Sequence, residues 1–158
     1  MTTRRQLTRA SLATLAVVAA AAISGCGMMN QKSGSAQSKT VAFSTQLRAS
    51  NEIPANTSTG TGMVDAVFNT STNELRWKGN YTGLTGPATA AHFHGPAAAT
   101  GNAGVVLPWP SPVANPIEGS ATLTAAQAAD LMAGRWYANI HTAANPAGEI
   151  RGQMTARP

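Results

Sequence analysis

The chain has 158 residues, with eleven Lys and Arg side chains against six Asp and Glu and a formal net charge of +5. Three of the basic side chains lie within the first nine residues, so residues 26–158 carry eight basic against six acidic groups. No basic tract remains there, which argues against nucleic-acid binding. The chain contains one cysteine and cannot form an internal disulfide.

The N-terminus predicts export and lipidation. Three arginines precede an apolar run over residues 12–23 that is too short to span a bilayer, which is typical of a signal peptide. The run ends in Ile-Ser-Gly-Cys at residues 23–26, which resembles a bacterial lipobox. We therefore predict that residues 1–25 are a lipoprotein signal peptide and that Cys26 is acylated. The alternative is a signal peptide that is cleaved elsewhere and leaves a free thiol.

Two further residues bear on the compartment. The adjacent Arg4 and Arg5 resemble a twin-arginine export signal, although an ordinary positive segment has the same composition. Gly27 follows the cysteine, whereas an Asp there resembles the inner-membrane retention signal of enteric-type bacteria. The expected localisation is extracytoplasmic and lipid-anchored, on the outer membrane, with either a periplasmic or a cell-surface orientation.

Beyond the cysteine, the composition changes twice. Residues 26–40 are rich in Gly, Ser and Gln and predict a flexible tether. Residues 41–156 predict one domain, in which apolar and polar residues alternate as in β-strands. The alternating runs cover residues 41–47, 64–68, 75–81, 88–94, 105–107, 135–141 and 149–154. Because turn-forming residues separate these short runs, we predict an all-β antiparallel fold, a Greek-key or immunoglobulin-like β-sandwich.

One segment predicts a helix instead. Thr124 is a suitable N-cap and Gln127, three residues later, completes a capping box. Gly134 suits the left-handed residue that follows a helix. We expect one short helix at about residues 124–134, packed against the sheet as a structural crossover.

The three histidines are the strongest candidates for a functional site in the chain. His92 and His94 flank Phe93, so both imidazoles point away from the apolar face of their strand. In the later strand, His141 shares a face with Tyr137 and Asn139. If the two strands are neighbours, the three imidazoles form a cluster that could hold a metal ion. The alternative is that they are polar-face side chains that make hydrogen bonds at strand ends.

Copper is the metal that such a site favours, because of its place in the Irving–Williams order and the open coordination positions that three imidazoles leave. Glu149 and Tyr137 are candidate further ligands, or partners that orient the rings. Two readings of Glu149 and Arg151 stay open: a solvated charge pair, or hydrogen bonds to His141 across a hairpin.

Other polar and aromatic residues have plainer interpretations. Residues 51–54 (Asn-Glu-Ile-Pro) are expected to form a structural turn rather than to supply a catalytic carboxylate. Trp77, Tyr81 and Trp136 are expected in the core, and Trp109 either covers the core or is displayed to a partner. No nucleophile triad and no phosphate-binding Gly loop can be recognised. The sequence therefore favours a binding or structural module over an enzyme.

Five segments together resemble the CHRD domain, the chordin-type module. They are residues 47–54 (Leu-Arg-Ala-Ser-Asn-Glu-Ile-Pro), 91–97 (Ala-His-Phe-His-Gly-Pro-Ala), 104–106 (Gly-Val-Val), 123–142, which include Arg-Trp-Tyr-Ala-Asn-Ile-His-Thr, and 146–153 (Pro-Ala-Gly-Glu-Ile-Arg-Gly-Gln). The resemblance implies a β-sandwich of immunoglobulin-like shape over about residues 41–155. It implies no particular activity.

A fainter similarity links the His-x-His strand and the Gly-rich loop after it to the copper-ligand strand of Cu,Zn superoxide dismutases. The chain lacks that family's cysteine pair and further histidines, so the similarity is compatible with a mononuclear copper site but not with the full dismutase site. The sequence thus predicts a lipid-anchored cell-envelope module whose partner is an envelope protein or a metal ion. The alternative is a copper protein for metal handling or redox protection.

Overall fold

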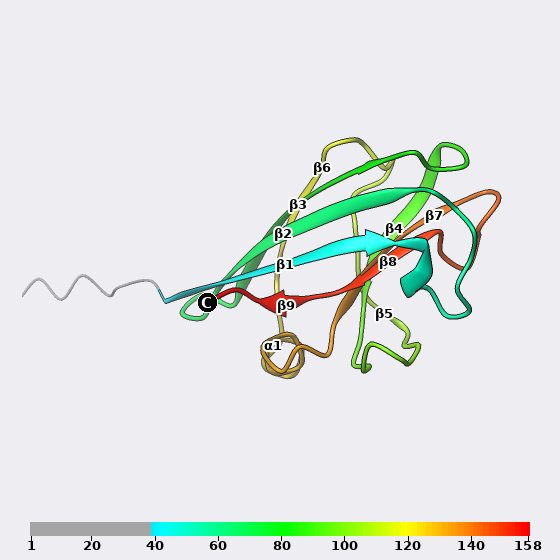
Figure 1. The fold of residues 1–158 in the computed structure, drawn as a ribbon. Coiled ribbons are helices and arrows are strands. Elements are labelled where there is room, and N and C mark those ends of the chain that lie inside the picture. Colours follow the sequence, from blue (N-terminus) through cyan, green and yellow to red (C-terminus); the bar gives the residue numbers. More distant parts are fainter. Residues whose placement is uncertain (1–38) are drawn as a thin grey trace, which may run out of the picture. The chain divides into compact units, whose positions relative to one another are not determined.

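The computed structural model describes residues 39–158. The predicted signal peptide, the lipidation site Cys26 and the predicted tether up to residue 38 lie outside the described residues. Nine strands and one short α-helix make up the described part (Figure 1). The strands are β1 (Thr40–Arg48), β2 (Thr61–Asn69), β3 (Glu74–Thr82), β4 (Ala88–His94), β5 (Val105–Pro108), β6 (Ile117–Thr122), β7 (Tyr137–Thr142), β8 (Ile150–Gln153) and β9 (Thr155–Ala156).

All strand pairs are antiparallel, in the order β5-β4-β7-β8-β1-β2-β3-β6, with β9 beside β1. This confirms the predicted antiparallel β class. The sheet is one continuous surface that curls, as Figure 1 shows. Trp77 on β3 and Phe93 on β4 stand far apart in the strand order, yet their ring centroids lie 5.4 Å apart. The two arms of the sheet therefore face each other across the core. The finer prediction of a Greek-key sandwich is not confirmed by this topology.

The predicted helix is confirmed. The α1 helix (Ala125–Met132) begins after Thr124, whose hydroxyl accepts a hydrogen bond from the Gln127 backbone, while the Gln127 side chain accepts one from the Thr124 backbone. This is the predicted capping box. Gly134 has a φ of +68°, as a residue that closes a helix does. Within residues 39–158, no helix combines the length and the apolar character needed to cross a membrane.

Two strands were not predicted. The short strand β9 and the edge strand β6 lack a clear apolar alternation, and Ile117 is the one fully buried residue of β6. Gly119, at the centre of β6, lies opposite Trp77 on β3. A Cβ atom at position 119 would lie 2.3 Å from the indole ring, so the strand has a glycine where the pattern expects an apolar side chain.

The core is built from the inward faces of the predicted strands. Phe43, Val64, Leu75, Phe93 and Ile140 are completely buried. Trp77 and Trp136 are core residues, as predicted, whereas Tyr81 is partly buried and packs against the core. Trp109 is only 6% exposed and packs against both Trp77 and Phe93. The interpretation of Trp109 as an indole displayed to a partner is therefore wrong, since it covers the core.

Candidate metal centre

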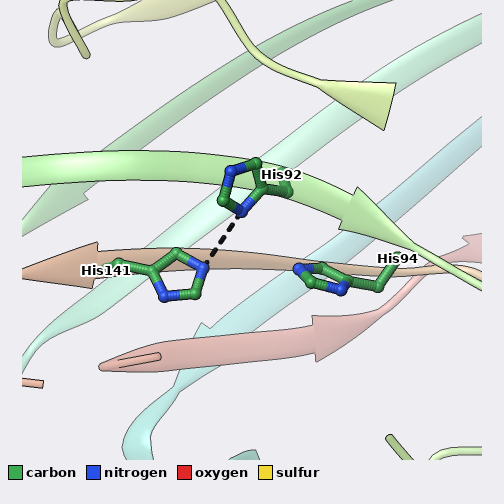
Figure 2. Close-up of side chains that lie close together, drawn as sticks. All are labelled: His92, His94 and His141. Atoms are coloured by element: carbon green, nitrogen blue, oxygen red, sulfur yellow. Dashed lines mark hydrogen bonds between the residues drawn. The ribbon is translucent and has the colours of Figure 1, made fainter. Parts of the chain in front are cut away.

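The three histidines lie together, as predicted from the alternation. β4 and β7 are hydrogen-bonded neighbours, in which His92 stands opposite Asn139 and Ala90 opposite His141. One ring nitrogen from each histidine can be chosen so that all three lie within 4.8 Å of one another. Figure 2 shows the imidazoles pointing toward a common space between the two strands. Among the described residues, this is the group of His, Cys, Asp and Glu side chains with the spacing to hold a metal ion.

His94 is held with one ring nitrogen directed into the cluster. Its Nδ1 lies 2.9 Å from the carbonyl oxygen of Ala103, and it must donate because that oxygen can only accept. The proton therefore sits on Nδ1, and Nε2 carries a lone pair. This Nε2 is buried and has no hydrogen-bond partner. A buried acceptor without a partner lowers stability, so its presence needs a reason.

His141 is oriented in the same way from the other strand. Its Nδ1 donates to the carbonyl oxygen of Pro146 over 3.0 Å, which leaves the lone pair on Nε2. Nε2 lies 3.1 Å from Nδ1 of His92, the contact drawn in Figure 2. In known metal sites the ligating histidines usually donate their second ring N–H to a carbonyl or carboxylate. Both His94 and His141 have that arrangement.

The surroundings keep two of the rings neutral. Burial and the neighbouring His141 and His94 lower the pKa of His92 to about 4. Burial also lowers the pKa of His141, against the opposing hydrogen bond to Pro146. His94 and His141 are each only 8% exposed because the loops with Ala103 and Pro146 cover the strands. At neutral pH His92 and His141 are therefore neutral, the form in which imidazole binds metals.

Tyr137 orients a ring of the cluster. Its ring is stacked on His94, with centroids 4.8 Å apart and planes inclined by 3°. Its hydroxyl donates to the Ala103 carbonyl over 3.2 Å, the same oxygen that His94 uses. The guanidinium of Arg151 covers the other face of the Tyr137 ring. Of the two roles considered for Tyr137, its contacts match that of a partner that orients a ring.

Glu149 lies among hydroxyl groups rather than among the imidazoles. Its carboxylate accepts hydrogen bonds from Ser58 at 2.6 Å, from Thr85 at 2.7 Å, and from Thr142. Burial opposes its ionisation, but the hydrogen bonds from Ser58, Thr142 and Thr85 outweigh burial and hold its pKa at about 2. The carboxylate therefore ties the loop before β2 and the loop before β4 to β7.

Both earlier readings of Glu149 and Arg151 are wrong. The two side chains are 0% and 2% exposed, so they are not a solvated charge pair. Arg151 donates to the Asn102 side chain at 2.7 Å and to the Gly101 carbonyl at 2.6 Å, and not to His141. The loop between β4 and β5 that covers His94 is thus anchored to β8. The sequence pattern could not predict the partners of Glu149 and Arg151, because the loops that bury these two side chains are distant in the sequence.

Asn139 is a site residue that the sequence analysis did not identify, although the alternation places it on the same face as His141. Asn139 is 2% exposed, and its Oδ1 lies 3.0 Å from Nε2 of His141. On its other side, the Asn139 side chain donates a hydrogen bond to the carboxylate of Glu52. Glu52 is 7% exposed, and burial raises its pKa to about 7 against the lowering effect of Arg151. The chain bends over residues 51–54, as predicted, after a single 3-10 turn (Ala49–Asn51) in which the Glu52 amide donates to the Ala49 carbonyl. The Asn51 side chain donates to the Arg151 carbonyl.

The described part of the chain is thus an antiparallel β domain with a three-imidazole cluster beneath two loops. A model of the CHRD domain family matches residues 43–154, which is most of the chain. The chain therefore belongs to the CHRD domain family. No curated protein and no solved structure matched the chain in the other two comparisons. The similarity to the copper strand of Cu,Zn superoxide dismutases stays a prediction.

Proposed function

We propose that this CHRD-domain protein is a lipid-anchored binding module of the cell envelope that holds one copper ion between His92, His94 and His141. One observation carries the proposal: Nε2 of His94 is buried, has no hydrogen-bond partner and belongs to a cluster of imidazole nitrogens within 4.8 Å of one another. A metal ion would satisfy this lone pair and those of the other two rings.

The spacing of the nitrogens supports binding after a small movement. An ion with metal–nitrogen bonds of about 2 Å holds its ligand atoms about 3–4 Å apart. The contact between His92 and His141, at 3.1 Å, already lies in this range. The widest separation of 4.8 Å has to shrink by about 1 Å. His92 is partly exposed and lacks a carbonyl anchor of the kind that holds the other two rings, so it is the ring that we expect to move.

The donor set favours copper. Three neutral imidazoles suit Zn²⁺, Cu²⁺ and Ni²⁺, and affinity in such a set rises to a maximum at Cu²⁺. The site also leaves coordination positions for water or another oxygen ligand, as tetragonal Cu²⁺ requires. Export past the cytoplasm, which the N-terminal segment predicts, would bring the site to a compartment where metal handling or redox protection is needed.

The shape of the domain fits a binding module. The contact between Trp77 and Phe93 across the core supports a two-layer, immunoglobulin-like arrangement of the curled sheet. Such sheets present their sites on the loops at one end, and the loops that carry Ala103 and Pro146 lie over the histidines.

The test is a calorimetric titration of the full-length, tag-free chain in detergent with Cu(II). We expect uptake of about one ion per chain, lost in the double variant His92→Ala/His94→Ala. The matched control is Arg76→Ala/Lys78→Ala, which removes two side chains at the same spacing from the exposed face of β3. Equal uptake by the wild type and the histidine variant would contradict the proposal, as would no uptake by the wild type.

A further inference from the structure

The atoms around His141 leave an oxygen without a hydrogen-bond donor. Nε2 of His141 carries a lone pair, because Nδ1 donates to Pro146. Asn139 Oδ1, which also only accepts, lies 3.0 Å from that nitrogen. His92 can supply one hydrogen to the lone pair of Nε2, over 3.1 Å, but that hydrogen does not serve Oδ1. Two acceptors at this distance repel each other unless a positively charged group satisfies both.

Glu52 fixes the orientation of the Asn139 amide. Nδ2 is the donor group of an asparagine side chain, and its hydrogen bond to Glu52 favours the ionised carboxyl group, whose oxygens only accept. The hydrogen bond from Asn139 to Glu52 therefore turns Nδ2 toward the carboxylate and Oδ1 toward His141. Both residues are more than nine-tenths buried, so the amide is held between strand β7 and the turn after β1. Turning the amide around would remove the hydrogen bond that Asn139 donates to Glu52.

We propose that Oδ1 of Asn139 is the fourth ligand of the metal ion and that Glu52 is the positioning residue that directs it. This inference rests on the proposed metal-binding function. A metal ion held by Nε2 and Oδ1 satisfies both lone pairs and keeps His141 as a ligand. A second proton on His141 would satisfy them only by removing His141 from the ligand set. Three imidazole nitrogens and one amide oxygen form the mixed N and O set that suits tetragonal Cu²⁺.

The buried carboxyl group of Glu52 is a second feature that a bound cation would accommodate. Oε1 of Glu52 is buried and has no hydrogen-bond partner. Burying a carboxylate in this way lowers stability unless a positive charge lies nearby. Arg151 supplies part of that charge, but its hydrogen bonds go to Asn102 and Gly101. A dication bound to Oδ1 of Asn139 would add a second positive charge, linked to Glu52 through one amide group.

Two variants of the full-length chain test the fourth ligand. Asn139→Ala removes the oxygen, and we expect Cu(II) affinity to fall at least about 10-fold, the loss typical of a disturbed metal shell. Pulsed electron paramagnetic resonance in deuterated water should then detect an additional water molecule on the ion. The swapped pair Glu52→Gln/Asn139→Asp exchanges the carboxylate and the amide between two side chains that differ in length. It keeps an oxygen toward His141, and its affinity should exceed that of Asn139→Ala and approach or exceed the wild-type value.

The outcomes separate this inference from the proposed function. If the wild type binds copper and Asn139→Ala binds as tightly, or gains no water on the ion, the fourth ligand is refuted while the metal site stands. If Asn139→Ala does not fold, as judged by circular dichroism, the swapped pair decides, and an affinity at least about 10-fold below the wild type refutes the inference. No copper uptake by the wild type refutes both proposals.

Discussion

The imidazole of His94 lies flat on the ring of Tyr137, with the two planes inclined by only 3° and the centroids 4.8 Å apart. Arg151 completes the stack, with Cζ 3.4 Å from the centroid of the Tyr137 ring. The Ala103 carbonyl accepts hydrogen bonds from both His94 and Tyr137 and so holds the two rings together. The position of the His94 ring is thus set by the Tyr137 ring as well as by the backbone of strand β4.

Removing that face should weaken the metal site. We expect Tyr137→Leu to lower Cu(II) affinity about 10-fold, because His94 loses the surface that orients it. Tyr137→Phe keeps the stack and loses only the hydrogen bond to Ala103, so it should bind copper nearly as the wild type does. Titration calorimetry of both variants measures the difference. Equal losses in the two variants would show that the hydroxyl, and not the ring face, matters.

Gly148 should tolerate no side chain. Its φ of +136° is one that residues with a Cβ rarely adopt, and a Cβ there would lie 2.5 Å from Oε1 of Glu52. We expect Gly148→Ala to lower the free energy of unfolding by about 2–3 kcal/mol. Gly104→Ala is the matched control, since a Cβ at position 104 meets no atom within 4 Å, and it should change stability by less than about 0.5 kcal/mol. Denaturant unfolding of both variants distinguishes them.

Glu149 makes stability depend on acid. Because its folded pKa is about 2, below the ordinary value of 4.5, its ionised form stabilises the folded state above about pH 4.5. That contribution, about 3 kcal/mol, is lost as the pH falls from about 4.5 to 2. We expect Glu149→Gln to be less stable than the wild type at pH 7 and the difference to vanish near pH 2. A difference that stays constant across this range would contradict the assignment.

Alternation along the strands predicted the shared face of the histidines. The two-residue period placed His92 and His94 on the strand face that Phe93 does not share. It placed Tyr137, Asn139 and His141 together on one face of the later strand. The pairing of β4 with β7 then brought the two sets together. Asn139 could have been included in the site from the same pattern. An asparagine in a strand carries no signal of metal binding by itself, so the pattern alone gives it no role.

The carboxylate and the loops could not be predicted in this way. Glu52 reaches Asn139 because β1 and β8 are neighbours in the sheet, a pairing that no local pattern reveals. The covering carbonyls of Ala103 and Pro146 belong to loops, whose paths depend on distant anchors such as Arg151. The alternation placed the imidazoles on the polar face of their strands, but it could not reveal that loops bury two of the three.

The lipid anchor is a separate prediction. Cys26→Ser removes the thiol that the lipobox-like segment predicts to be acylated. The protein should therefore leave the membrane fraction or accumulate unprocessed. Cell fractionation and mass spectrometry of the N-terminus measure this. Unchanged fractionation and mass would rule out Cys26 as the anchor and leave the metal site untouched.

The most direct test of the account is to count the imidazoles on bound copper. One equivalent of Cu(II) is added to the full-length, tag-free chain, and electron spin-echo envelope modulation is recorded at neutral pH. We predict signals from three imidazoles in the wild type and no specific copper signal in the variant His92→Ala/His94→Ala, which loses the site. A spectrum of the wild-type complex with one imidazole or none would contradict the assignment of His92, His94 and His141 as a metal site.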